Sequence, residues 1–343
     1  HKRGMKIVMD AVFNHTGREF FAFEDIMEKG EKSKYLDWYY IEKFPLESER
    51  GEIPNYKCFG YYGGMPKLNL KNPEVEKFFT DVACYWIKEC DIDGWRMDVG
   101  DEISHYFWKN FRRAVKAVKK DMLIIGEIWH YAGDFLEGDE WDTVMNYPFY
   151  LNLIDLLADE KINVSQFIQN LGYLKGRLNK KCYPLMWNLI DSHDTARFLH
   201  LCKDNKKKQH LAAAFQLLLP GMPMIYYGDE FAMPGANDPD CRRGMYWDEE
   251  YQDKEMFEWY KQLLKVRKNH ACIVEGEPLE IAARDGEETI VLTRKNDEET
   301  LALIFNCSSS ARMFNEYAQK YDLLRENPFD GKIEGLDAAV IVL

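Results

Sequence analysis

A short apolar segment followed by an amphipathic helical pattern recurs along the first 270 residues, and this alternation limits the fold more than any other feature. Strand, helix and strand in this order predict parallel βα units, because a parallel partner strand is reached through a crossover helix. The segments predicted as parallel strands are 5–9, 94–99, 122–128, 143–146, 185–190 and 224–227. The segments predicted as helices are 74–90, 106–120, 151–178, 209–219 and 251–270.

Two other parts of the chain depart from this alternation. Residues 17–70 are rich in aromatic residues, glycine and proline without a sustained helical period, which predicts a long irregular excursion. Residues 271–343 contain short alternating segments, which predict a small antiparallel β domain. The expected parts are therefore 1–16, 17–70, 71–270 and 271–343.

Charge and composition exclude several classes of partner. The chain carries 45 Lys and Arg against 58 Asp and Glu, a formal net charge of −13, which disfavours nucleic acid. The longest apolar runs fall well short of the ~20 residues of a membrane-spanning helix, so no membrane partner is expected. Eight cysteines without a CxxC spacing predict reduced thiols and a cytoplasmic protein.

Two acidic residues at the ends of neighbouring predicted strands point to chemistry. Arg96 and Asp98 project to the same face of their strand, and an ion pair between them would lower the pKa of Asp98. Glu127 lies between apolar neighbours, where desolvation would raise its pKa. A nucleophile beside a general acid, on strands about 4.8 Å apart, matches a retaining glycosidase.

Each of these acids, taken singly, is more often a helix N-cap or a solvated loop residue. The joint pattern shifts this balance. Polar residues follow several predicted strands and would meet at the C-terminal rim of a barrel, where catalytic residues of such folds lie. They are Asp10, Asn14, His15, Arg96, Asp98, Glu127 and 192–194.

At these positions the chain resembles the α-amylase family of glycoside hydrolases. The stretches 10–15, 94–99, 126–130 and 191–195 are similar to its four ordered motifs. The stretch 65–69 is similar to a signature of the neopullulanase, cyclomaltodextrinase and maltogenic amylase branch.

The resemblance implies a (β/α)8 barrel in which strands three to eight are present and strands one and two are missing. It implies an irregular domain inserted after strand three and a C-terminal antiparallel β-sandwich. Because six strands cannot close such a barrel, we expect the chain to be an N-terminally truncated portion that folds poorly or lacks activity alone. The full-length protein is expected to be a homodimer.

The resemblance also implies roles for single residues. Asp98 would be the nucleophile, Glu127 the acid and base, and Asp194 the carboxylate that holds the sugar hydroxyls. The residues implied in substrate binding are Asp10, His15, Arg96, Glu102, Trp129, His130, His193, Asp238 and Arg242. Asn14 ligates calcium in many relatives and is a candidate calcium ligand, although the reaction requires no cofactor.

The predicted activity is retaining hydrolysis of α-1,4 and α-1,6 glucosidic bonds in cyclodextrins, maltooligosaccharides or pullulan. A non-catalytic sugar-binding or scaffold protein is an alternative, which the presence of all three carboxylates disfavours. A third interpretation, a transglycosylase of the same fold, also stays open. Gly100 and Asp101 stand where this branch more often has Ala and Asn, which leaves the preference on the reducing side undetermined.

Overall fold

The computed structural model describes residues 1–47 and 53–343, so the portion 48–52 of the expected inserted domain lies outside the described residues. Across those described ranges, no helix combines the length and the apolar character needed to cross a bilayer. All eight cysteines lie in them, and none forms a disulfide, as predicted.

The chain divides into two compact units, and each is described by itself. The first unit comprises His1–Ile128 and Ala132–Met145, and the second comprises Trp129–Tyr131 and Asn146–Leu343.

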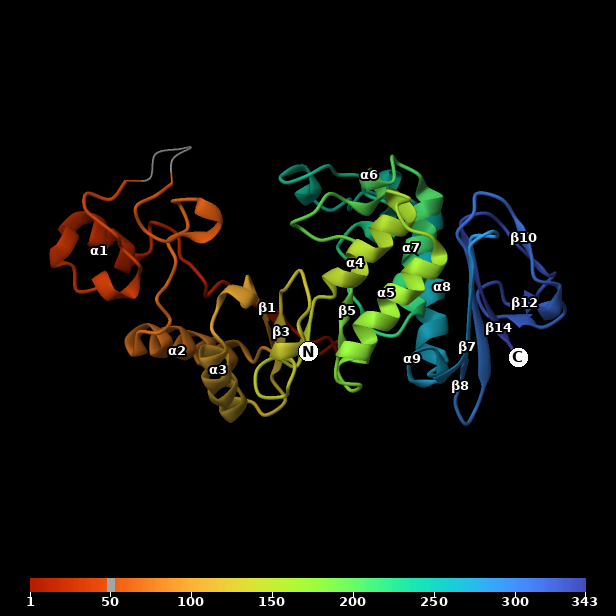
Figure 1. The fold of residues 1–343 in the computed structure, drawn as a ribbon, viewed down its shortest axis with the longest axis horizontal. Helices are drawn as coiled ribbons and strands as arrows, with labels where there is room; N and C mark the ends of the chain where they lie inside the picture. The colour runs from red at the N-terminus through yellow and green to blue at the C-terminus, as the bar shows by residue number, and fades with distance from the viewer. Residues whose placement is uncertain (48–52) are drawn as a thin grey trace. The chain divides into compact units, whose positions relative to one another are not determined.

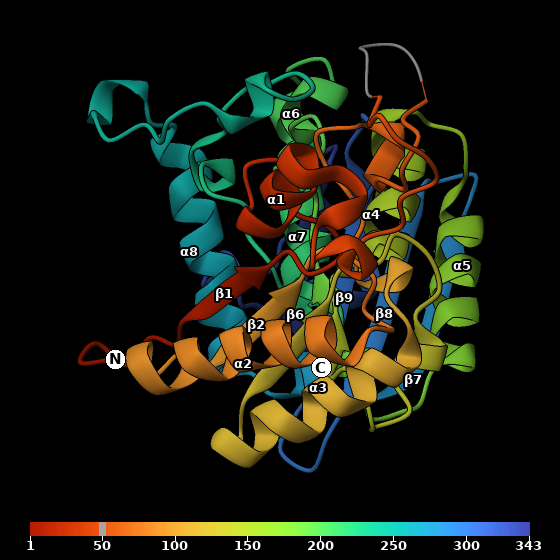
Figure 2. The ribbon, with the colours of Figure 1, turned by 90° about the vertical axis from the view of Figure 1, so that its left-hand side faces the viewer.

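The first unit is built on a parallel sheet with the strand order β1-β2-β3-β4. Its strands are β1 (Val8–Ala11), β2 (Gly94–Met97), β3 (Leu123–Gly126) and β4 (Thr143–Val144), and its α-helices are α1 (Phe21–Lys29), α2 (Pro73–Cys90) and α3 (His105–Val118). Helices α2 and α3 lie side by side next to this sheet (Figure 1, Figure 2). Helix α2 begins as predicted, with Pro73 in its first turn and the side chain of Asn72 accepting the Glu74 N–H at 2.9 Å.

The described residues of the segment 17–70 contain an α-helix that the sequence did not predict. Helix α1 buries Ala22, Phe23 and Ile26. The ring of Phe23 packs against the rings of Tyr39 and Tyr56, with centroids 5.0 and 5.2 Å away. These aromatic side chains are therefore core residues of this segment.

The second unit contains the remaining helices and a short parallel strand pair. Its α-helices are α4 (Tyr147–Leu153), α5 (Val164–Arg177), α6 (Phe198–Leu201), α7 (Lys206–Leu218), α8 (Lys254–Asn269) and α9 (Cys272–Glu275), and β5 (Trp187–Asn188) pairs with β6 (Met222–Pro223). The strand predicted at 224–227 is wrong in position, because β6 ends at Pro223. There the Met224 N–H still donates to Asn188 O at 2.8 Å, while the carbonyl of Met224 accepts from the side chain of Gln216 at 2.7 Å.

The C-terminal residues form the predicted antiparallel sheet, with the strand order β12-β11-β14-β9-β8-β7. Its strands are β7 (Glu277–Arg284), β8 (Thr289–Lys295), β9 (Thr300–Asn306), β11 (Tyr321–Asp322), β12 (Asn327–Pro328) and β14 (Asp337–Val342), and β10 (Arg312–Met313) pairs separately with β13 (Lys332–Ile333).

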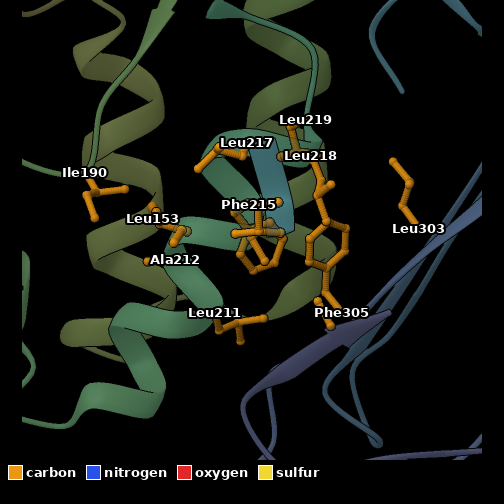
Figure 3. Close-up of a cluster of buried hydrophobic side chains, with 14 of the residues drawn as sticks. Leu153, Ile190, Leu211, Ala212, Phe215, Leu217, Leu218, Leu219, Leu303 and Phe305 are labelled. Atoms are coloured by element: carbon orange, nitrogen blue, oxygen red, sulfur yellow. The ribbon is translucent and has the colours of Figure 1, made fainter. Parts of the chain in front are cut away.

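One hydrophobic core joins this sheet to the helices of the second unit. Helix α7 is buried along most of its length, and the Phe215 ring stacks on the Phe305 ring of β9 with centroids 4.2 Å apart (Figure 3). Leu303 and Val340 belong to the same cluster. Helices α5 and α7 run along one face of the sheet (Figure 1), so this face is a core face.

Candidate active site

The Arg96 guanidinium lies among three carboxylates in the first unit. Its Nη1 atom donates to Asp10 Oδ1 at 2.9 Å and to Asp98 Oδ1 at 2.6 Å. Its Nη2 atom lies 3.1 Å from Glu127 Oε2. The predicted ion pair between Arg96 and Asp98 is confirmed. We call Asp10, Arg96, Asp98 and Glu127 the first cluster.

The parallel register explains why these side chains meet. Met97 lies opposite Ala11 on one side and opposite Gly126 on the other. Beyond the strand ends, the Asp98 N–H donates to Ala11 O at 3.1 Å and the Glu127 N–H donates to Met97 O at 3.0 Å. The pairing therefore continues for one residue, which places Asp98 and Glu127 at neighbouring positions, as predicted.

Burial separates the two candidate catalytic acids. The Glu127 side chain is 6% exposed, whereas the Asp98 side chain is 19% exposed. The expectation of an apolar setting for Glu127 is only half right, because Arg96 and the Val99 N–H, which donates at 2.9 Å, both contact its carboxylate. Burial by itself lowers the pKa of Arg96, but the charges of Glu127, Asp10 and Asp98 raise it above its usual value.

Lys67, a lysine of the 65–69 signature for which no separate role was predicted, contacts two of the predicted site residues. Its Nζ atom donates to Asn14 Oδ1 at 2.7 Å and to Glu102 Oε2 at 2.7 Å. His15 stacks on the Phe59 ring, with centroids 5.2 Å apart, and burial lowers the pKa of His15.

The surroundings of Asn14 do not fit a calcium ion. Its side-chain oxygen, the atom that would ligate the metal, is held by the Lys67 ammonium group. In the described part of the chain, no group of three or more His, Cys, Asp or Glu residues could hold a metal ion. The calcium expectation at Asn14 therefore finds no support in the donor set.

A second cluster, comprising His193, Asp194, Asp238 and Arg242, lies in the second unit. Arg242 Nη2 donates to Asp194 Oδ1 at 3.1 Å, and its Nε atom lies 3.1 Å from Asp238 Oδ1. The same Nε donates to the carbonyl of His193 at 2.8 Å. His193 Nε2 lies 3.1 Å from Asp194 Oδ2. The structure thus brings together four residues that the sequence predicted for one function.

Trp129 and His130 also belong to the second unit. The Trp129 ring stacks on the Tyr147 ring, with centroids 3.9 Å apart and an interplanar angle of 14°. Trp129 and His130 line a cavity of about 410 Å³ together with Tyr131, Tyr173 and Arg177. Indole and phenol rings at the wall of a cavity suit the apolar face of a sugar ring.

The part of the chain that carries both clusters matches a known domain. Residues 1–276 match the family model described as the catalytic domain of alpha amylase. This chain belongs to the alpha-amylase family. The resemblance seen in the motifs is therefore confirmed, and this family's catalytic domain is a (β/α)8 barrel followed by an antiparallel β domain. The described residues of this alpha-amylase family member contain six parallel strands, which do not form one closed sheet.

Curated relatives of this alpha-amylase family chain carry the branch names. The chain is 44% identical over 311 residues to a cyclomaltodextrinase of Geobacillus thermopakistaniensis, covering 91% of this chain and 53% of that protein. It is 47% identical over 277 residues to neopullulanase 2 of Thermoactinomyces vulgaris, covering 80% and 47%. It is 42% identical over 307 residues to an intracellular maltogenic amylase of Bacillus subtilis, covering 89% and 51%. The chain spans about half the length of these relatives.

A solved structure of a cyclomaltodextrinase superposes with a TM-score of 0.93 at 37% identity, covering 99% of this chain and 61% of that one. The likeness therefore extends over the antiparallel sheet as well as the parallel strands.

Proposed function

We propose that the protein containing this chain is a retaining α-glucan hydrolase. The observation that carries the proposal is the first cluster, in which a buried Glu127 and a more exposed Asp98 occupy neighbouring strand-end positions and share Arg96. Neighbouring strands lie about 4.8 Å apart, which favours the ~5 to 5.5 Å carboxyl separation of retaining glycosidases over the wider gap of inverting ones.

In the proposed reaction, Glu127 donates its proton to the glycosidic oxygen while Asp98 attacks the anomeric carbon. The bond from this carbon to the leaving sugar breaks as the bond to the Asp98 oxygen forms. Water then attacks the same carbon, Glu127 takes its proton, and the ester bond to Asp98 is broken. Arg96, which donates to Asp98 Oδ1 at 2.6 Å, would orient the Asp98 carboxylate for attack.

Substrate class and the remaining roles follow from the relatives and the motifs. The names of the relatives support cyclodextrins, maltooligosaccharides or pullulan as substrates. We propose that Asp194 is the third catalytic carboxylate. The residues proposed to bind substrate are Asp10, His15, Arg96, Glu102, Trp129, His130, His193, Asp238 and Arg242. No cofactor is proposed for the reaction.

The finer features of the fold and the setting are proposals as well. We propose that β1 to β6 correspond to barrel strands three to eight and that residues 17–70 form an inserted domain. We propose a homodimer, and a location in the cytoplasm fits the naming of one relative as intracellular.

The test compares the intact protein with its Asp98→Asn variant on cyclodextrin, maltooligosaccharide and pullulan. We expect the variant to lose about 10⁴-fold in kcat, because the amide cannot form the glycosyl ester. Asp81→Asn, which changes an exposed carboxylate of α2 paired with Lys77, is the matched control and should keep full activity. Retention of more than about one percent of kcat by Asp98→Asn would contradict the role. Product analysis with added glucose separates hydrolysis from transglycosylation.

A further inference from the structure

Two buried carboxyl groups and one buried guanidinium lie together in the second unit, outside both clusters described above. Asp191, Arg197 and Asp229 are each only 1% exposed. Tyr260 of α8 is buried near both carboxyl groups, and the ring of Tyr226 lies 4.0 Å from the Arg197 guanidinium carbon. We call Asp191, Arg197 and Asp229 the buried acid cluster.

Each carboxyl group of this cluster accepts a hydrogen bond through one of its two oxygens. Asp229 Oδ1 accepts from Arg197 Nη1 at 3.1 Å, and Asp191 Oδ2 accepts from the Phe198 N–H at 2.7 Å. Asp191 Oδ1 and Asp229 Oδ2 are buried and find no donor among the described residues. The side chains of Asp191 and Asp229 lie within interaction range, since each influences the pKa of the other. Two ionised carboxylates are both acceptors, so a hydrogen bond between them needs a proton.

The balance of charges also requires that one of the two carboxyl groups is protonated. One ionised carboxylate balances the positive charge of Arg197, and a second ionised carboxylate would leave an uncompensated negative charge in the interior. Burial raises the pKa of Asp191 to about 6 and raises the pKa of Asp229 well above its usual range. Two buried carboxyl groups that interact in this way titrate as a pair, and the pair holds one proton.

The buried acid cluster is connected to the loop that carries His193 and Asp194. Arg197 Nε donates to the carbonyl of Cys241 at 3.2 Å, and Cys241 Sγ donates to the carbonyl of His193 at 3.3 Å. Within the loop, the Asp194 N–H donates to Ser192 Oγ at 3.2 Å. The buried acid cluster is therefore linked through Cys241 to the backbone of His193, next to Asp194, which Arg242 contacts.

We propose that Asp191 and Asp229 share a single proton and that, together with Arg197, they are positioning residues that fix His193 and Asp194 for the reaction. The kinetic part of this inference rests on the proposed function.

A shared proton makes a specific pattern of substitutions the test. In Asp229→Asn the amide supplies a permanent donor to Asp191, and in Asp191→Asn it supplies one to Asp229, so one carboxylate still balances Arg197 in each variant. The double variant Asp191→Asn with Asp229→Asn leaves Arg197 without a counter-charge. In the intact protein we expect each single variant to keep kcat within about threefold, and the double variant to lose about 100-fold, because a misplacement of about 1 Å costs this much.

Asp248→Asn, the same change at an exposed carboxylate of the second unit, is the control and should keep full activity. If either single variant loses more than tenfold in kcat, or if the double variant keeps wild-type kcat, the proposal is overturned. Circular dichroism shows whether the double variant is folded.

Infrared spectroscopy tests the proton independently of activity and of the double variant's folding. At neutral pH the difference between the spectra of the intact protein and Asp229→Asn should contain a carboxylic acid C=O stretch, separate from any band of Glu127, and the difference between the intact protein and Asp248→Asn should not. Identical spectra for the wild type and Asp229→Asn would overturn the shared proton. A wild type that shows this band but hydrolyses no glucan would contradict the proposed function and leave the proton assignment supported.

Discussion

Gly126→Ala is expected to damage both the stability of the first unit and the placement of Glu127. A Cβ atom at Gly126 would lie 2.2, 2.4 and 2.5 Å from three ring atoms of Trp141. The indole has no free space, because it is 1% exposed, stacks on Phe135 at 4.1 Å and meets Trp108 edge-on at 5.7 Å. We therefore expect a loss of about 1–3 kcal/mol in the free energy of unfolding, the usual cost of overpacking a core.

The same substitution should lower kcat, because Glu127 directly follows Gly126. A displacement of the strand end by about 1 Å would cost about 100-fold. The measurements are urea unfolding followed by tryptophan fluorescence and kcat on a maltooligosaccharide.

Gly172→Ala is the matched control for this experiment. It lies inside α5, where an added Cβ meets nothing within 4 Å, so it should stabilise the protein by about 0.5–1 kcal/mol. An unfolding free energy for Gly126→Ala within about 0.5 kcal/mol of wild type, together with unchanged kcat, would refute the reasoning.

Three further predictions concern single side chains. Burial lowers the pKa of His210 to about 4. Between pH 6.5 and 4 the unfolded state therefore binds more protons than the folded state, and the free energy of unfolding falls by up to about 3 kcal/mol as the pH falls. His210→Gln should remove this pH dependence, which urea titrations across that range will measure. Asn163→Ala should destabilise α5 by about 1 kcal/mol, because Asn163 and Gln166 form a reciprocal capping box, and an unchanged unfolding midpoint would disprove the cap's contribution. Arg96→Lys should lower kcat by at least tenfold, since one ammonium group cannot reproduce the fork that contacts Asp10, Asp98 and Glu127, and steady-state kinetics on a maltooligosaccharide will measure this loss.

The fold was predictable where local signals were strong. The Asn-Pro start and the apolar face of α2 located that helix to within a residue, and the alternation of β8, β9 and β14 identified the antiparallel sheet. Helix α1 was missed because its short apolar stripe is embedded among glycine and aromatic residues of the preceding loop. The end of β6 was missed, because the contact of the Gln216 side chain with the carbonyl of Met224 depends on the packing of α7 beside the strand and is not visible in the segment 224–227 itself.

Site prediction followed the same division between local and long-range information. Alternation along one strand placed Arg96 and Asp98 on one face, and strand order placed Glu127 beside them. That Arg96 also contacts Asp10 and Glu127 depends on the register of three strands, which no single stretch contains. Likewise, the contact of Lys67 with Asn14 spans 53 positions, so neither motif by itself contains it.

Because Phe215 stacks on Phe305, the antiparallel sheet cannot be removed or exchanged without exposing the core of the second unit. A deletion that removed β8 and β9 would leave the most buried helix of the second unit with a wet aromatic face, and aggregation rather than a smaller working enzyme is the expected outcome.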